Sequence, residues 1–152
     1  MKRSGLFPGS FDPFTKGHQD IVLRALPLFD EIVIGIGQNS NKARYFSLEK
    51  MKGYIEQTFQ GKPVRVVTYQ DLTANVAKEV GAKFIIRGLR NTTDFEYENS
   101  ISQVNRHINP ELETVFLITS PHLAPISSTI IRDLHRYGSK IDDYLPYDLN
   151  GI

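Results

Sequence analysis

The chain has 152 residues, a length typical of a single domain, and 40% of its residues are hydrophobic and 23% charged. This composition excludes a disordered or collagen-like chain, and a formal net charge of +1 gives no reason to expect binding to nucleic acid or to a membrane. The absence of cysteine excludes a disulfide framework, a Cys-ligated zinc site and a thiol nucleophile.

The N-terminal stretch is where a targeting signal would appear. It starts with the basic residues Lys2 and Arg3 but reaches Pro8 and Gly9 before an apolar stretch long enough for a signal peptide. Elsewhere, no run approaches the ~20 apolar residues of a membrane helix. We therefore expect a soluble, cytoplasmic protein with no membrane partner.

Five short runs rich in apolar and β-branched residues predict strands. Their near-continuous apolar character is typical of a parallel sheet that is covered on both faces. The runs are Arg3 to Phe7, Glu31 to Ile36, Val64 to Thr68, Lys83 to Ile86 and Thr114 to Ile118.

The segments between these runs have helical spacing, and each is expected to place an apolar stripe against the sheet. Ser47, with Glu49 just inside, suits a helix N-terminus, and Gly138 suits the end of the last helix. The stripes are Val22, Ala25, Leu26 and Phe29; Leu48, Met51 and Ile55; Tyr97, Ile101, Val104 and Ile108; and Ile130, Ile131, Leu134 and Tyr137.

The alternation of strands and helices predicts one Rossmann-like, doubly wound α/β domain over residues 1–152, with a five-stranded parallel sheet flanked by helices. Residues 142–152 are interpreted as a tail or short terminal turn. Because such sheets bind ligands at the carboxyl ends of their strands, the loops after strands are the candidate sites.

The loop after the first strand has the sequence PGSFDPFTKGH over residues 8–18. Its glycines let a ligand approach the backbone, and His18 is expected to open a helix whose start favours a phosphate. An isolated Gly-x-His would more often be an ordinary turn, but an eleven-residue string is more specific.

A second candidate phosphate site has the sequence PISSTIIR over residues 125–132. Ser127 to Thr129 are N-cap candidates for the last helix, and this structural role would explain them alone. Hydroxyls and free N–H groups at a helix start also form an anion site, so the two roles are compatible.

The middle of the chain has the sequence IIRGLRNTTDFEYE over residues 85–98. Arg87 and Arg90 are expected on a loop after the fourth strand, with Gly88 between them, where guanidinium groups can meet phosphates. The alternative is that they pair with Asp94, Glu96 or Glu98 and serve stability only.

These blocks carry a family resemblance. The first two resemble the T/HxGH and ISSS/TxxR signatures of the nucleotidyltransferase superfamily, and IRGLR with DFEYE resembles the phosphopantetheine adenylyltransferase family over nearly the whole chain. The resemblance implies transfer of AMP from ATP to 4′-phosphopantetheine by direct in-line displacement, giving dephospho-coenzyme A and pyrophosphate. This reaction is the penultimate step of coenzyme A biosynthesis.

The resemblance also implies residue roles, with His18, Lys42 and Arg90 as the catalytic residues. Phosphopantetheine is expected to meet Ser10, Lys42, Thr73 and Arg87, although many members have an apolar residue at the position of Thr73. Lys42 taken alone would more often be a solvated loop lysine. The expected ATP-binding residues are Ser10, Phe11, His18, Gly88, Leu89, Arg90, Glu98, Leu123, Ala124, Pro125, Ile126, Ser127, Ser128 and Thr129.

Mg²⁺ is expected to arrive with ATP, because no carboxylate cluster in the sequence specifies a metal site built by protein side chains. The resemblance further implies a homohexamer and feedback inhibition by coenzyme A, and no nucleic-acid partner is expected. Two alternatives remain open: a sister transferase acting on nicotinamide mononucleotide or glycerol phosphate, and a non-catalytic nucleotide-binding regulator.

Overall fold

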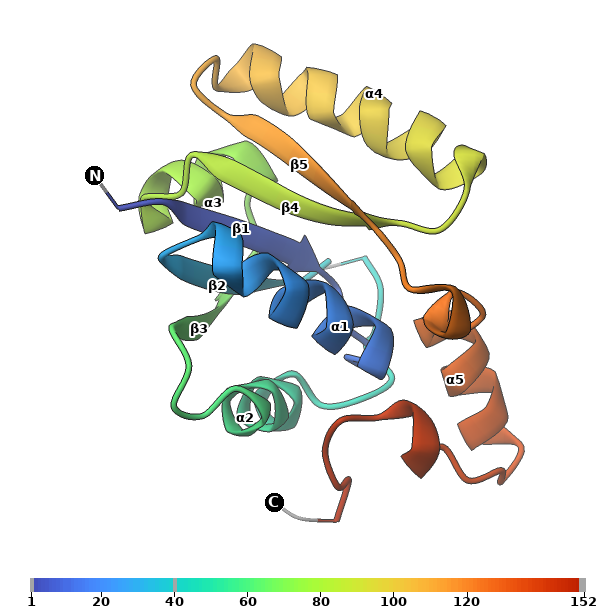
Figure 1. The fold of residues 1–152 in the computed structure, drawn as a ribbon. Coiled ribbons are helices and arrows are strands. Elements are labelled where there is room, and N and C mark those ends of the chain that lie inside the picture. The colour runs from blue at the N-terminus through green and yellow to red at the C-terminus, as the bar shows by residue number, and fades with distance from the viewer. Residues whose placement is uncertain (1, 40, 151–152) are drawn as a thin grey trace.

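A computed structural model describes residues 2–39 and 41–150. Five parallel strands form one sheet in the order β3-β2-β1-β4-β5 (Figure 1). This order confirms the Rossmann-like prediction and puts the topological switch point between β1 and β4. The strands are β1 (Ser4–Gly9), β2 (Glu31–Gly37), β3 (Val64–Tyr69), β4 (Phe84–Leu89) and β5 (Glu113–Ile118).

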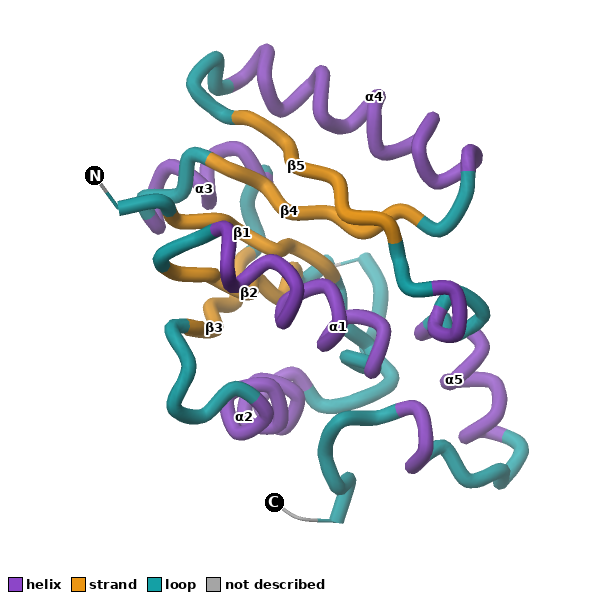
Figure 2. The backbone as a smooth tube through the Cα atoms, in the orientation of Figure 1, coloured by secondary structure: helices purple, strands orange, loops and turns teal. Residues whose placement is uncertain are grey.

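Helices cover both faces of the sheet (Figures 1 and 2). Helices α1 and α2 lie on one face, and α3 and α4 lie on the other. The helices are α1 (Lys16–Ala25), α2 (Leu48–Thr58), α3 (Thr73–Val80), α4 (Thr92–Ile108) and α5 (Ser128–Arg136). None of the helices in the described ranges has the length and apolar composition that a membrane crossing requires.

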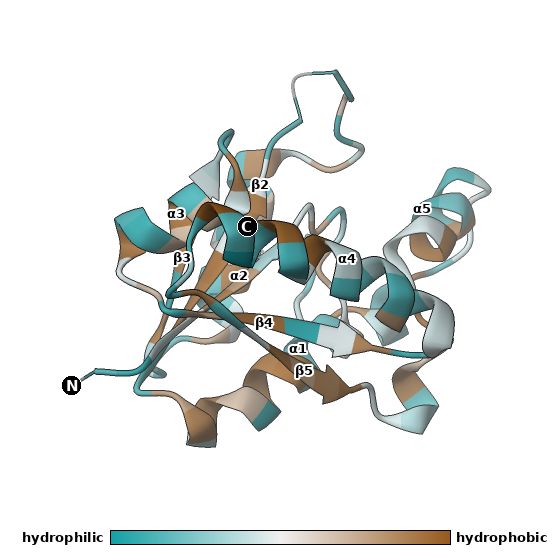
Figure 3. Cartoon of the chain, turned by 90° about the horizontal axis from the view of Figure 1, so that it is seen from above, coloured by the Kyte–Doolittle hydropathy of each residue, from teal (hydrophilic) through white to brown (hydrophobic). Residues whose placement is uncertain are grey.

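The core is split by the sheet into two clusters, because successive side chains of a strand point to opposite faces. Ile32 and Ile34 of β2 pack with the residues of α1 and α2, while Val33 between them packs with α3. All three side chains are fully buried. In Figure 3, β5 is mostly brown, whereas α4 alternates between brown and teal.

Two of the differences from the predicted element boundaries concern candidate site residues. Strand β4 continues to Leu89, so Arg87 and Gly88 lie on a strand and not on a loop. The polar Arg87 suggested that the strand had ended, but pairing with β5 continues through Leu89. Helix α1 begins at Lys16, so His18 is its third residue and does not open it.

The prediction that the apolar stripe of α4 packs against the sheet is wrong. Tyr97, Ile101 and Val104 are 64%, 40% and 56% exposed, whereas Glu98 and Asn105 are buried. The helix is rotated so that Glu98 meets Arg87 of the sheet through two hydrogen bonds. The covered face of α4 is therefore the one that carries Glu98, the partner of Arg87.

Residues 142–150 contain a 3₁₀ turn, Asp142–Tyr144, and pack against the rest of the molecule. Leu145 is buried in a small cluster with Ile131 of α5, and the hydroxyl of Tyr54 donates to the carbonyl of Leu149. The domain limits at residues 1 and 152 stay a prediction, because residues 1, 151 and 152 lie outside the described part of the chain.

Candidate active site

The switch point of the sheet opens a crevice. Strand β1 pairs with β2 at every residue from Ser4 to Gly9, but it pairs with β4 only at Gly5 and Leu6. Beyond Leu6 the two central strands are no longer paired at their carboxyl ends. Three cavities meet there and share Ser10; we name them the His18, Tyr69 and Lys42 cavities.

The His18 cavity, of about 290 Å³, lies between the starts of α1 and α5. Gly88 forms part of its wall, where a Cβ would lie 3.2 Å from the side chain of Ile21 on α1. Glycine therefore lets α1 approach the sheet closely at this point. The predicted residues that line the cavity are Ser10, Phe11, His18, Arg87, Gly88, Arg90, Glu98, Leu123, Ile126, Ser127 and Ser128; Leu89, Ala124, Pro125 and Thr129 are not among its lining residues.

His18 is held by a capping box at the start of α1. The backbone N–H of Thr15 donates to His18 Nδ1 at 2.9 Å, and the His18 backbone N–H donates to the Thr15 hydroxyl at 3.4 Å. Because Nδ1 accepts a hydrogen bond, the neutral imidazole carries its proton on Nε2. Nε2 is thus the donor left for a ligand.

The surroundings of His18 disfavour a charged ring. Its ring centroid lies 5.0 Å from that of Phe11 and 5.3 Å from that of Phe14. Burial, followed by the positive charges of Arg87 and Arg90, lowers the pKa of His18 to about 3. His18 is therefore a neutral hydrogen-bond donor in the free protein at physiological pH.

The start of α5 forms the opposite side of the His18 cavity. Ser127 caps the helix by accepting from the N–H of Ile130 at 3.2 Å, which is the structural role weighed from sequence. The hydroxyl of Ser128 donates to the carbonyl of Pro13 at 2.8 Å and ties α5 to the loop after β1. The positive end of the helix dipole still faces the cavity and favours an anion.

Both arginines of the middle block are engaged in ion pairs. Arg87 donates to both carboxylate oxygens of Glu98, at 2.8 and 2.6 Å, and to the carbonyl of Pro8. Arg90 pairs with Asp94 at 2.9 Å. The pairing with acidic residues that the sequence offered as an alternative is therefore present. Both arginines also line the His18 cavity.

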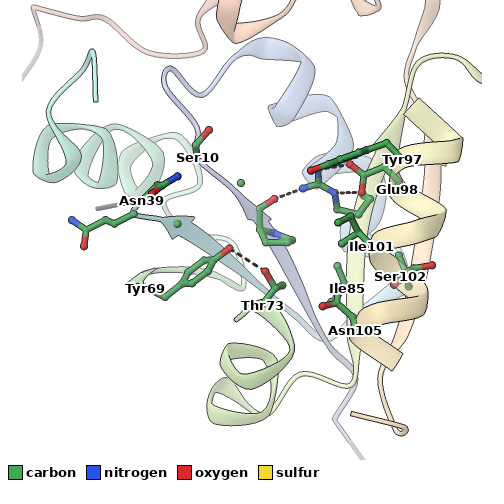
Figure 4. A pocket seen from close by; sticks show the side chains of 16 residues that line it. Ser10, Asn39, Tyr69, Thr73, Ile85, Tyr97, Glu98, Ile101, Ser102 and Asn105 are labelled. Atoms are coloured by element: carbon green, nitrogen blue, oxygen red, sulfur yellow. Dashed lines mark hydrogen bonds and ion pairs between the residues drawn. The ribbon is translucent and has the colours of Figure 1, made fainter. Parts of the chain in front are cut away.

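The Tyr69 cavity, of about 380 Å³, lies across β1 from the His18 cavity, with α4 as one wall (Figure 4). The Tyr69 hydroxyl lies 3.5 Å from the Thr73 hydroxyl at the start of α3. Thr73 and Arg87, both predicted to meet phosphopantetheine, line this cavity. The two cavities share Pro8, Gly9, Ser10, Arg87 and Glu98.

Several residues of the Tyr69 cavity were missed from sequence. Tyr97 and Ile101 of α4 were assigned to packing against the sheet, and Tyr69 was left outside the predicted strand. The position of Tyr69 at the carboxyl end of β3 was the available signal. Ser102 and Asn105 were not assigned to a site from sequence, because their place in the cavity wall depends on the rotation of α4.

The Lys42 cavity, of about 640 Å³, is lined by Lys42, Arg44, Arg132 and Arg136 as well as Ser10. Lys42 does not line the other two cavities. Its backbone N–H donates to the carbonyl of Asn39 at 3.1 Å, which closes a turn after β2. The structure places Lys42 and His18 in different cavities that share Ser10, and their catalytic roles stay predictions.

A histidine donor and a second helix start flank one cavity at the switch point of a Rossmann-like sheet, and a second cavity adjoins it. The family model described as cytidylyltransferase-like matches residues 6–134. The matched region covers most of the chain and includes the strands and helices that line the site.

Curated relatives identify the particular group. The phosphopantetheine adenylyltransferase of Cytophaga hutchinsonii is 57% identical over 150 residues, covering 98% of this chain and 100% of the relative. The phosphopantetheine adenylyltransferase of Flavobacterium johnsoniae is 51% identical over 145 residues, covering 95% of both chains. The chain belongs to the phosphopantetheine adenylyltransferase family, within the cytidylyltransferase-like proteins.

A solved structure shares the fold at low identity. The bifunctional NMN adenylyltransferase/ADP ribose pyrophosphatase of Francisella tularensis, complexed with AMP and a manganese ion, is 21% identical with a TM-score of 0.71. The match covers 97% of this chain and 45% of that protein. The similarity supports the fold and says nothing about the acceptor.

Proposed function

We propose that the chain transfers AMP from ATP to the phosphate of 4′-phosphopantetheine, releasing pyrophosphate and dephospho-coenzyme A. The observation that carries this proposal is the junction of the His18 and Tyr69 cavities at Ser10. One cavity offers phosphate donors at two helix starts, and the other offers a partly apolar space for the pantetheine arm. An acceptor phosphate at Ser10 would therefore lie beside the α-phosphate of ATP.

The proposed reaction is a direct in-line displacement. An oxygen of the acceptor phosphate forms a bond to the α-phosphorus, and the bond from the α-phosphorus to the oxygen of the leaving pyrophosphate breaks. Because the attacking phosphate is already an anion, no strong general base is needed. The protein aligns the reactants and stabilises negative charge on the α-phosphate through His18, Lys42 and Arg90.

Magnesium fits this site as a companion of ATP. Within residues 2–39 and 41–150, no group of three or more His, Cys, Asp or Glu side chains is placed to hold a metal ion. Mg²⁺ prefers phosphate oxygens and water in such sites, so the polyphosphate would be its main ligand. When bound, the ion would neutralise charge on the polyphosphate.

The acceptor is tested by measuring pyrophosphate release from ATP and Mg²⁺ with 4′-phosphopantetheine, with nicotinamide mononucleotide, or with no acceptor. We expect release only with 4′-phosphopantetheine and loss of activity with excess EDTA. Release only with nicotinamide mononucleotide would reject the acceptor, whereas ATP binding without release would indicate a non-catalytic regulator.

The assembly and its regulation belong to the same proposal. A homohexamer would cover the exposed apolar residues of α4, including Tyr97, Ile101 and Val104.

Coenzyme A contains both a pantetheine arm and an adenylyl group, so it would compete for both cavities as a feedback inhibitor. A cytoplasmic location is proposed because ATP is supplied there.

Replacing Val104 with aspartate is expected to dissociate the assembly, because a charge on an apolar interface loses its hydration without gaining a partner. Light scattering should give a hexamer for the wild type and a smaller species for the variant. The control is Leu28→Asp, at a residue that is 47% exposed on the opposite side of the sheet. A wild-type protein that is monomeric at micromolar concentration would contradict the hexamer.

A further inference from the structure

Five consecutive backbone carbonyls in the loop after β1 accept hydrogen bonds from side chains of distant segments. The donors come from the segment after β2, from α5 and from the C-terminal segment. The pairs are Arg44 Nη1 to Ser10 O (2.5 Å), Arg44 Nη2 to Phe11 O (2.9 Å), Arg132 Nη1 to Asp12 O (2.7 Å), Ser128 Oγ to Pro13 O (2.8 Å) and Tyr147 Oη to Phe14 O (2.7 Å).

Arg44 is the donor in this set that lies in the same segment as Lys42. Its guanidinium also donates from Nε to the carbonyl of Phe46 at 3.1 Å, so that it bridges its own segment and the loop after β1. The side chain is only 16% exposed. A planar fork with several donors suits this bridging role, which a lysine ammonium would not reproduce.

Asp12 also links the loop after β1 to the segment after β2. Its carboxylate oxygens accept the backbone N–H groups of Tyr45 and Phe46, each at 2.8 Å, and lie 3.7 Å from the Arg44 guanidinium. Asp12 is buried. The contacts therefore run in both directions: Arg44 holds carbonyls of the loop after β1, and Asp12 holds N–H groups of the segment after β2.

The anchored loop has an unusual backbone conformation beside the site. Phe11 has φ of 46°, in the left-handed region that residues other than glycine rarely adopt. Its carbonyl and that of Ser10 are the two that Arg44 holds. Such a conformation persists only where surrounding contacts maintain it, and the two hydrogen bonds from Arg44 are among those contacts.

We propose that Arg44 is a positioning residue for the transfer reaction: it holds the segment that carries Lys42 against the Ser10–Phe11 turn, and so places Lys42 beside the acceptor phosphate. This inference rests on the proposed function. Each nitrogen of the Arg44 guanidinium donates to a backbone carbonyl, so its main role is to hold these segments together. It acts through Lys42, two residues away.

The test is a double-mutant cycle on kcat with Arg44→Met and Lys42→Met. We expect Arg44→Met alone to lower kcat by about a hundredfold, as misplacement of a reacting group does. We expect Lys42→Met to lower kcat by about 10²–10³-fold in the wild-type background but by no more than about threefold in the Arg44→Met background. Affinity for ATP, measured without acceptor, should stay near the wild-type value.

Two further measurements separate positioning from general destabilisation. Amide hydrogen exchange of residues 41–46 should be faster in Arg44→Met, and Arg44→Lys, which retains the charge but not the fork, should recover only part of kcat. The control is Arg65→Met, which removes an exposed arginine that donates to the Val80 carbonyl at 3.0 Å, far from the site. It should leave kcat and this exchange unchanged.

The outcomes distinguish this inference from the proposed function. An equal loss from Lys42→Met in both backgrounds would overturn the positioning role, and so would wild-type kcat in Arg44→Lys. A wild-type protein that releases no pyrophosphate would reject the proposed function and, with it, the role of Arg44 in transfer. In that case faster exchange in Arg44→Met would still show that Arg44 anchors the segment.

Discussion

Replacing His18 with alanine is expected to lower kcat by about 10²–10³-fold while affinity for ATP changes little, because one preorganised donor to the α-phosphate is lost. The capping box fixes the Nδ1 atom of His18 and leaves Nε2 as a neutral donor. In this variant the start of α5 and the cavity wall around Gly88 remain available to bind ATP. Single-turnover kinetics and nucleotide titration would measure the two quantities separately.

The design includes a variant that separates donation from charge. His18→Gln retains a neutral N–H donor and should recover part of the lost rate, whereas His107→Ala, near the exposed end of α4, should leave it unchanged. Near-normal turnover in His18→Ala would exclude the catalytic role of His18.

The low pKa of His18 adds a pH-dependent readout. In the unfolded chain His18 takes up a proton near its ordinary pKa of about 6.5, but in the folded protein burial and two arginines lower this pKa to about 3. The unfolded state therefore binds the proton first, and stability falls as pH drops through this range. His18→Gln should flatten this part of the stability curve by up to about 1.4 kcal/mol per pH unit.

Replacing Arg87 with methionine is expected to destabilise the protein by about 3 kcal/mol, because it leaves the buried carboxylate of Glu98 without its partner. Side-chain exposure is 9% for Glu98 and 30% for Arg87, so the pair has limited access to solvent. The variant also leaves the carbonyl of Pro8, in the crevice, without its hydrogen bond from Arg87. Urea unfolding monitored by circular dichroism would measure the change.

A second change should restore stability without restoring activity. In the double variant Arg87→Met, Glu98→Leu no charge is left unpaired, and we expect most of the lost stability to return. Turnover should remain low, because both residues line the two cavities. Lys2→Met, which breaks an exposed pair with Glu31, should cost less than about 1 kcal/mol. If Arg87→Met is as stable as Lys2→Met, the pair has no structural role.

Much of the fold could be predicted from sequence because local patterns determine it. Buried parallel strands require continuous apolar runs, and the five runs are strands in the structure, with ends shifted by at most three residues. Glycine, proline and hydroxyl residues at strand-to-helix junctions indicated two loops that line one cavity in the structure. Both signals come from residues that are neighbours in the chain.

The rotation of α4 could not be predicted in this way. Its apolar stripe resembled a sheet-facing surface, but the Arg87–Glu98 pair turns Glu98 inward and leaves Val104 exposed. The same rotation brings Tyr97 to the Tyr69 cavity. Helical periodicity defines an apolar face, but contacts with other elements decide whether that face is covered.

The sequence by itself determined the chain's elements, its candidate phosphate-binding loops and its resemblance to one enzyme family. Only the tertiary structure decided the protonation of His18, the pairing of Arg87 and the anchoring of the Lys42 segment by Arg44. Hydrogen bonds to backbone carbonyls and burial among distant side chains produce these features. They join residues from 11 to 79 positions apart, so local patterns indicated the Arg87 pairing only as one alternative and did not indicate the other two features.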